Sequence, residues 1–445
     1  MALIELDREA RPGPSPASRP PLAARRRAGL LVCLALLAAL GGAAPAAGIR
    51  WRYLGAISAP DGPVQLAGGR LYTVDTSGTE PSVTAWDPAG PPVPRWTARV
   101  PVGDDRGVIP VASVTVRQAG DVALLTAGAR TTAVDNATGR IRWSSPIAVT
   151  VLAGSGIGVT VDRVFRPGTG YDQDSGDPGP LYFSATGEPH TEPPLRTEVR
   201  GLDLSDGRTI WTSTPGGSVT VDEVPGDEPA VLITSSERLS LVAGRTGELI
   251  RQAELPRFAG HGPVSGSLLG DVALVSYRNP GRQVAFDART LRRLWIRAVR
   301  DLVADPADCQ GVLCDGEHGD LRILDPVSGR PRWRVQEDVD LAVRAGYVLQ
   351  TDAASGEPVR LSDPHTGATR VDLTGWTAPV AGASHEPLLL RRAEADGQAF
   401  AAVVPGHAEI RRLGVTGTGP GDCDSDGHHL VCHSAGGLRI WAYRI

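Results

Sequence analysis

The feature that most constrains the fold is a short motif that recurs along the chain. An apolar run, an aspartate, a turn and a tryptophan follow one another in AWDPAGPPVPRW from Ala85, AVDNATGRIRW from Ala133, GLDLSDGRTIW from Gly201, AFDARTLRRLW from Ala285 and ILDPVSGRPRW from Ile323. Weaker copies begin at Leu241, Leu361, Ala402 and Arg439. The equivalent positions are mostly about 40 residues apart, which is the period of a repeat architecture. They are Asp87, Asp135, Asp203, Ala243, Asp287, Asp325, Asp363, Val404 and Ala442.

Each copy predicts a β-hairpin. The apolar run suits a strand, and the Asp carboxylate can accept backbone N–H groups of the next turn. Four residues after the Asp position, a glycine can take the positive φ of the turn. The tryptophan then presents a broad ring on the return strand. The glycines are Gly139, Gly207, Gly247, Gly329 and Gly367, and the tryptophans are Trp143, Trp211, Trp295 and Trp333.

Two further strand-like runs precede each motif, such as Asp121 to Gly128 and Asp271 to Tyr277. Four short strands per period are typical of a propeller blade. The C-terminal GLRIWAYRI supplies a third strand, and Gly48 to Ile57 supplies a fourth that would pair with it and close the ring. Nine units can be counted, but propellers have about 4 to 8 blades. The prediction is therefore all-β, a single propeller of four-stranded antiparallel blades over residues 49–445, eight-bladed, with seven or nine as alternatives.

Composition agrees with a loop-rich β protein and excludes one class of partner. The 445 residues include 54 Gly and 37 Pro, which interrupt long helices. All the basic residues are arginine and the net charge is −5, so the chain lacks the basic surface of a nucleic-acid-binding protein.

The N-terminus is predicted to lie outside the propeller. Residues 1–27 are rich in Pro and Arg and are predicted to form a disordered cytoplasmic tail. Residues 28–48 carry no charge and are long enough for one transmembrane helix, with three arginines before them that favour export of residues 49–445. A cleaved signal peptide, with Ala44 to Ala46 as its processing site, is the alternative. Cys33 follows Val32, a poor lipoprotein site.

Four cysteines remain in the exported part, in two local pairs. Three connectivities exist for four cysteines, and the local one is favoured because each pair flanks a Gly-containing turn. The predicted disulfides are Cys309 with Cys314 and Cys423 with Cys432, which suit an oxidising compartment.

The repeat resembles that of PQQ-like (quinoprotein alcohol dehydrogenase-like) β-propellers. The family pattern A-x-D-x-x-T-G-x-x-x-W is almost intact in AVDNATGRIRW, and the resemblance covers nearly all of residues 49–445. It implies that the Asp, Gly and Trp of each unit dock neighbouring blades, as in bacterial members of the family. These residues are Asp135, Gly139 and Trp143, Asp203, Gly207 and Trp211, and Asp325, Gly329 and Trp333.

The enzymes of this family carry a disulfide between adjacent cysteines, and no two cysteines are adjacent here. P-loop, H-E-x-x-H and G-x-S-x-G motifs are absent from the sequence as well. The sequence therefore predicts a non-catalytic binding or scaffolding module of the cell envelope, monomeric, with an unidentified protein or small-molecule partner. A PQQ-dependent oxidoreductase, or another small-ligand enzyme that uses the central funnel, is the alternative. The insertion from Phe165 to Leu195 is the loop predicted to carry specificity.

Two acidic stretches could bind calcium, although no cofactor is required by the prediction. Asp422, Asp424 and Asp426 have the D-x-D-x-D-G spacing of a calcium loop, but His433 replaces the usual glutamate at the twelfth position. A transition-metal site with Cys423, Cys432 and the neighbouring histidines would compete with the disulfide. The second stretch holds Asp172, Asp174 and Asp177, with looser spacing. Asn136 begins a glycosylation sequon within the repeat's own turn.

Overall fold

The computed structural model describes residues 51–58, 62–101, 114–179, 181–217, 219–278, 280–299, 309–316, 319–380, 386–395, 397–417 and 421–445. The predicted tail, residues 1–27, and the predicted anchor or signal peptide, residues 28–48, lie outside these ranges. Within the described part, no helix has the length and apolar character needed to cross a membrane.

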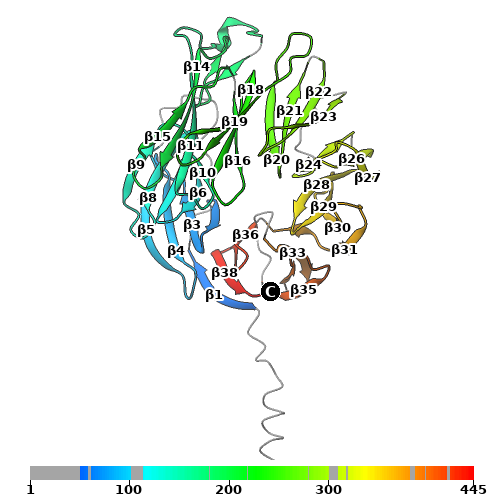
Figure 1. Cartoon of the computed structure of the whole chain (residues 1–445). Helices are drawn as coiled ribbons and strands as arrows, with labels where there is room; N and C mark the ends of the chain where they lie inside the picture. Colours follow the sequence, from blue (N-terminus) through cyan, green and yellow to red (C-terminus); the bar gives the residue numbers. More distant parts are fainter. Residues whose placement is uncertain are drawn as a thin grey trace, which may run out of the picture. The chain divides into compact units, whose positions relative to one another are not determined.

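The described chain is built from antiparallel sheets that follow one another in sequence order, and we number these sheets as blades (Figure 1). Blade 1 contains β2 (Val64–Ala67), β3 (Arg70–Asp75), β4 (Ser82–Asp87) and β5 (Val93–Arg99). Blade 2 contains β6 (Val114–Ala119), β7 (Val122–Ala127), β8 (Arg130–Asp135) and β9 (Ile141–Ser145). Blade 3 contains β10 (Thr150–Leu152), β11 (Ile157–Val164), β14 (Arg196–Asp203) and β15 (Thr209–Ser213).

The middle blades repeat this order. Blade 4 contains β16 (Thr220–Val224), β17 (Ala230–Thr234), β18 (Arg238–Ala243) and β19 (Leu249–Glu254). Blade 5 contains β20 (Ser265–Leu269), β21 (Val272–Tyr277), β22 (Arg282–Asp287) and β23 (Arg293–Ala298). Blade 6 shows three strands among the described residues, β25 (Cys314–Asp315), β26 (Leu321–Leu324) and β27 (Pro331–Val335).

The last blades bring the two ends of the propeller together. Blade 7 contains β28 (Val339–Arg344), β29 (Tyr347–Asp352), β30 (Pro358–Ser362) and β31 (Thr369–Asp372), and the short β24 (Cys309–Gln310) pairs with β28 in parallel. Blade 8 contains β32 (Ala378–Pro379), β33 (Leu388–Glu394), β34 (Gly397–Val403) and β35 (Ile410–Thr416). Blade 9 contains β36 (Cys423–Ser425), β37 (His429–Ser434), β38 (Gly437–Tyr443) and β1 (Trp51–Ile57), which lies beside β38 as predicted (Figure 1).

The described residues thus form nine blades, and the expectation of eight was wrong. That expectation came from the usual size of propellers and assumed that one weak motif copy was irregular. In the structure all four weak copies lie in blades, because Leu241, Leu361, Ala402 and Arg439 belong to β18, β30, β34 and β38. Counting the repeats in the sequence gave the better number.

The hydrophobic core lies between blades. Each junction between successive blades has its own cluster of buried side chains, including one between blades 9 and 1 that contains Leu54, Leu71 and Ile440. Every sheet therefore buries apolar residues on both faces, which explains the nearly continuous apolar runs of β7, β17 and β21.

Candidate functional site

The repeated Asp, Gly and Trp residues lie in contacts between blades. The Trp143 ring packs against Gly207 of the next blade, where an added Cβ would lie 2.7 Å from the ring. Its Nε1 donates to Leu204 O at 2.9 Å. Trp211, Trp295 and Trp333 make the same hydrogen bond to the carbonyls of Gly244, Pro326 and Pro364, and they pack against Gly247, Gly329 and Gly367. Trp96 extends the series to Gly139 in blade 2.

The turn position loses its glycine where the tryptophan is missing. Arg251 stands at the tryptophan position of blade 4, and Leu291, with φ of 54°, stands at the glycine position of blade 5. The equivalent glycines have φ between 67° and 73°, so the backbone conformation is shared. A side chain can therefore adopt this conformation where no ring occupies the space, and the glycines both suit the positive φ and make room for the tryptophans.

The aspartates of the motif stabilise the hairpin turns. Asp135 Oδ1 accepts from the backbone N–H of Thr138 at 2.9 Å, and Oδ2 pairs with Arg142 at 2.5 Å on the return strand. The hydrogen bond from Arg142 lowers the pKa of Asp135 to about 2. Asp325 and Asp363 pair in the same way with Arg332 and Arg370. These carboxylates already accept hydrogen bonds from the turn backbone and pair with an arginine of the return strand.

The Asn136 side chain is not available as a glycosylation acceptor in the folded protein. Asn136 is 7% exposed, its Oδ1 accepts from the Tyr72 hydroxyl at 3.1 Å, and its carbonyl accepts from Trp96 Nε1. The sequon residue is thus part of the contact between blades 1 and 2.

The acidic residues of the predicted calcium loop do not converge on one point. Asp424 Oδ2 accepts from Leu66 N of blade 1 at 2.8 Å. Asp426 Oδ1 accepts from the backbone N–H of His428 and His429, and its Oδ2 lies 3.0 Å from His429 Nδ1. Among the described residues, no group of three or more His, Cys, Asp or Glu side chains is placed to hold a metal ion. Cys423 is bonded to Cys432, and Cys309 to Cys314.

Asp424 instead belongs to a recurring contact between the innermost strands. Gln65, Asp222 and Asp424 occupy the same register position, and each binds a backbone N–H of the next blade's innermost strand, those of Val116, Leu268 and Leu66. Burial raises the pKa of both aspartates. Because the innermost strand is the edge of each sheet, these side chains satisfy N–H groups that have no strand partner.

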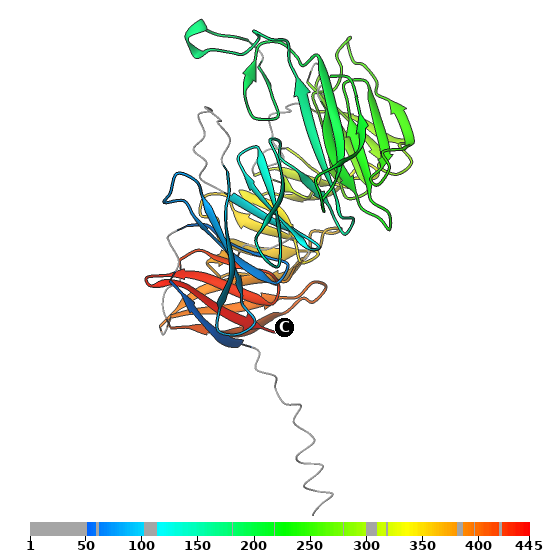
Figure 2. The ribbon, with the colours of Figure 1, turned by 90° about the vertical axis from the view of Figure 1, so that its left-hand side faces the viewer.

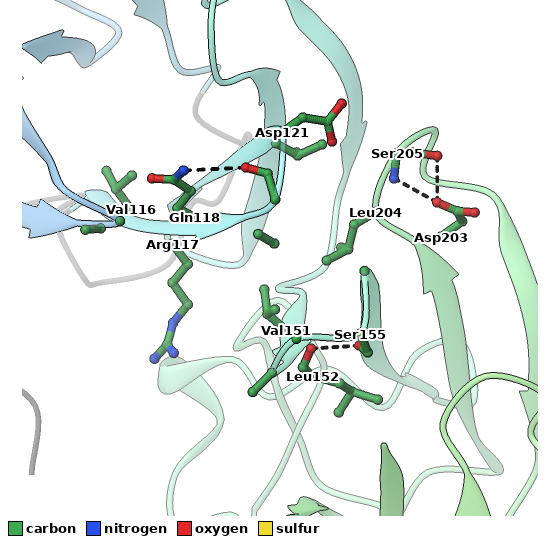
Figure 3. A pocket seen from close by; sticks show the side chains of 18 of the residues that line it. Val116, Arg117, Gln118, Asp121, Val151, Leu152, Ser155, Asp203, Leu204 and Ser205 are labelled. Atoms are coloured by element: carbon green, nitrogen blue, oxygen red, sulfur yellow. Dashed lines mark hydrogen bonds between the residues drawn. The ribbon is translucent and has the colours of Figure 1, made fainter. Parts of the chain in front are cut away.

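The described residues enclose a cleft of about 750 Å³ beside the inner strands of blades 1 to 4 (Figure 3). Turns from four blades form it, and Val116, Val151, Leu152 and Leu204 supply apolar walls. Glu223 on its rim accepts from Ala153 N at 2.8 Å.

Most of the charged groups of this cleft are engaged. Asp121 pairs with Arg142, and Asp203 binds the turn at Ser205. Arg117 makes no ion pair or hydrogen bond to the described residues, and Figure 3 shows its side chain extending away from Gln118. The cleft can thus accept a small apolar group but brings together no acid–base pair. The sequence could not reveal it, because its walls come from turns far apart in the chain.

The predicted insertion forms a folded arm between β11 and β14, which we define as residues 165–195. It contains the turn η1 (Gln173–Ser175) and the two-stranded hairpin β12 (Tyr182–Phe183) and β13 (Pro189–His190). The His190 ring stacks on Phe165, with centroids 3.8 Å apart, and its Nδ1 lies 3.1 Å from Thr169 Oγ1. Figure 2 shows the arm extending beyond the blades, and Phe183 at the hairpin is 53% exposed.

Comparison with known proteins agrees with the repeat pattern. Residues 195–393 match the family described as PQQ_2, outer membrane protein assembly factor BamB. The chain is a β-propeller similar to that family. The matched stretch runs from the end of the arm to β33. No curated protein matches the chain.

Several solved structures are similar at low identity. BamB from Moraxella catarrhalis is 14% identical, with 88% of this chain and 100% of that chain covered and a TM-score of 0.36. The computationally designed Ika8 protein is 13% identical, with coverages of 88% and 99% and a TM-score of 0.42. A europium-containing methanol dehydrogenase is 13% identical, with coverages of 86% and 85% and a TM-score of 0.36.

Proposed function

We propose that this protein is a non-catalytic binding or scaffolding module of the cell envelope that contacts a protein partner through the arm. The carrying observation is the arm itself, an insertion in one repeat unit that is folded by its own contacts and exposes Phe183. Rigid scaffolds commonly place binding residues on such loops. The arm is held at its base by β11 and β14, which pair along eight residues.

Two observations support an extracytoplasmic location. The described cysteines form two disulfides, and such bonds persist in oxidising compartments. The family matched by residues 195–393 is described as an outer membrane protein assembly factor, which agrees with a role in the envelope. Membrane attachment through residues 28–48 is part of the proposal.

Photo-crosslinking in intact cells tests the proposal. A photoreactive phenylalanine analogue replaces Phe183 in the arm or, as a matched control, Tyr53 on the outer strand of blade 9, since both side chains are 53% exposed. We expect one protein partner to be crosslinked from position 183 and not from position 53. Equal products from both positions, or none from position 183, would contradict a partner-binding arm.

A second measurement addresses the oxidoreductase alternative. The purified protein is mixed with PQQ and calcium, and bound quinone absorbance and dye-linked oxidation of alcohols or sugars are recorded. We expect neither signal, because the carboxylates of Asp121 and Glu223 in the cleft and of Asp424 and Asp426 in the predicted calcium loop are already engaged. Retained quinone together with substrate oxidation would replace the scaffolding proposal by an enzymatic one.

A further inference from the structure

One strand of blade 3 has a long edge that its own sheet does not cover. β11 has eight residues, but β10 pairs only with Ile157, Gly158 and Val159. In blade 2, by contrast, β6 pairs with all six residues of β7. The edge of β11 from Thr160 to Val164, on the side of the innermost strands, therefore has no strand beside it among the described residues.

The chain before β10 turns away from this edge. Val149 N donates to Thr131 Oγ1 of blade 2 at 3.1 Å, and the Ser145 hydroxyl donates to Ile147 O at 2.8 Å. Residues 146–149 are thus held by other contacts and do not extend β10 along β11.

The backbone N–H and C=O groups along this edge are oriented so that they can pair with another strand. In antiparallel pairing, alternate residues direct their N–H and C=O groups to the same neighbour. Leu204 N donates to Gly156 O, so the even-numbered residues of β11 bond to β14. Val161 and Arg163 consequently point their backbone groups to the uncovered side. Both are partly exposed, and no described residue on that side bonds to those groups.

Side chains around the edge favour a particular strand. Val164 and Leu195, at the base of the arm, are 37% and 62% exposed, and they offer an apolar contact. Asp162 projects from the same face as Val164, and its carboxylate pairs with Arg200 of β14 at 3.2 Å.

A small cavity of about 170 Å³ adjoins Arg163. It is lined by residues of three blades, among them Thr220, Thr234 and Ser265.

The charge of the arm adds selectivity. The arm carries five carboxylates, those of Asp172, Asp174, Asp177, Glu188 and Glu192, against the single cation of Arg166. A segment with arginine or lysine between apolar residues therefore complements the acidic arm.

We propose that the edge of β11 from Thr160 to Val164 binds an extended segment of the protein partner as an added β-strand, with basic and apolar residues alternating. This inference rests on the proposed function and names the partner's chemistry. Main-chain hydrogen bonds to Val161 and Arg163 supply affinity, and the acidic arm selects the charge.

Defined peptides and a backbone variant test this mode of binding. The probes are a ten-residue peptide of alternating valine and arginine, the same peptide with glutamate for arginine, and the arginine peptide N-methylated at its four central residues, which cannot pair as a strand. Affinity for the whole protein is measured by fluorescence anisotropy. We expect the arginine peptide to bind at least about tenfold more tightly than either control peptide.

The protein variant is Val161→Pro, with Val161→Ile as its control. Proline removes the N–H that points to the uncovered side and leaves the pairing with β14 in place, and such positions tolerate proline at sheet edges. We expect Val161→Pro to weaken binding of the arginine peptide about tenfold or more relative to Val161→Ile. Its melting temperature should fall below that of Val161→Ile, because proline gives up part of the packing of Val161 between blades 3 and 4. Strand addition would be overturned if the N-methylated peptide bound as tightly as the arginine peptide. It would also be overturned if a folded Val161→Pro protein bound the arginine peptide as tightly as the wild-type protein does.

The two proposals fail separately. If position 183 still crosslinks to one partner but the three peptides bind with equal affinity, the scaffolding role is retained and the β11 site is refuted. Loss of that crosslink in Val161→Pro, with Val161→Ile retaining it, supports the site in cells.

Discussion

The contact between tryptophan and glycine in adjacent blades makes a sharp stability prediction. Gly329 has φ of 67°, and a Cβ built there lies 2.8 Å from Cδ2 of the Trp295 ring and 3.0 Å from Cε2 and Cγ. Gly329→Ala would therefore add two costs, the left-handed backbone conformation and the overlap with the ring. The first is about 1–2 kcal/mol. The second is about 1–3 kcal/mol, as for other overpacked sites.

Gly270 provides the matched control. Its φ is 59°, and an added Cβ meets no atom within 4 Å. Gly270→Ala should then cost only the backbone share, about 1–2 kcal/mol. We expect the Gly329→Ala protein to unfold at a clearly lower urea concentration than Gly270→Ala, with similar dependence on urea for both.

A double-mutant cycle isolates the ring. Trp295→Ala removes all three close atoms, so Gly329→Ala should cost about as much as Gly270→Ala in that background, and the coupling should be about 1–3 kcal/mol. Equal losses for Gly329→Ala and Gly270→Ala in the wild-type background, or no coupling with Trp295→Ala, would refute the steric account.

Three further outcomes are expected from contacts between blades. Trp333→Ala removes the hydrogen bond to Pro364 O and the packing on Gly367, and it should lower the free energy of unfolding by about 3 kcal/mol or more without affecting the crosslink at position 183; an unchanged urea midpoint would disprove its docking role. Arg142 lowers the pKa of Asp135 from 3.8 to about 2, so the melting-temperature advantage of wild type over Asp135→Asn should be present above pH 3.8 and disappear as the pH falls through about 2; a pH-independent difference would contradict this. Asp424→Ala should be less stable than Asp424→Asn in thermal melts, because the amide oxygen can still accept from Leu66 N, and millimolar calcium should shift neither curve.

Much of the blade structure can be predicted from the sequence because the motif records local geometry. The Asp, Gly and Trp positions predict a hairpin turn and a ring facing the next blade, and the contacts of Trp143 with Gly207 show that geometry. The missing glycine at Leu291 is also predictable from the sequence. Arg251 stands at the tryptophan position of the preceding blade, so no ring requires a glycine at position 291. The prediction of eight blades was wrong because propellers usually have eight or fewer, whereas all nine repeats of this chain form blades in the described residues.

The candidate sites depend on contacts that a single sequence does not display. The run from Ile147 to Leu152 is apolar and suits a longer strand, but Thr131 of another blade captures Val149 N and leaves β11 uncovered. Asp424 has the spacing of a calcium ligand, yet ring closure places Leu66 N beside it. Both outcomes are set by residues far away in the chain, so local spacing could not decide them.

The pairing of β1 with β38 has a consequence for the order of folding. Trp51 pairs with Tyr443, so the outermost strand of blade 9 is synthesised first and its partner almost last. Until then β1 exposes an unpaired edge, and so long a sequence separation makes ring closure a slow, late step. Cys423 and Cys432 lie in this same blade. An incompletely closed chain would therefore present a free strand edge in the blade that also carries this disulfide.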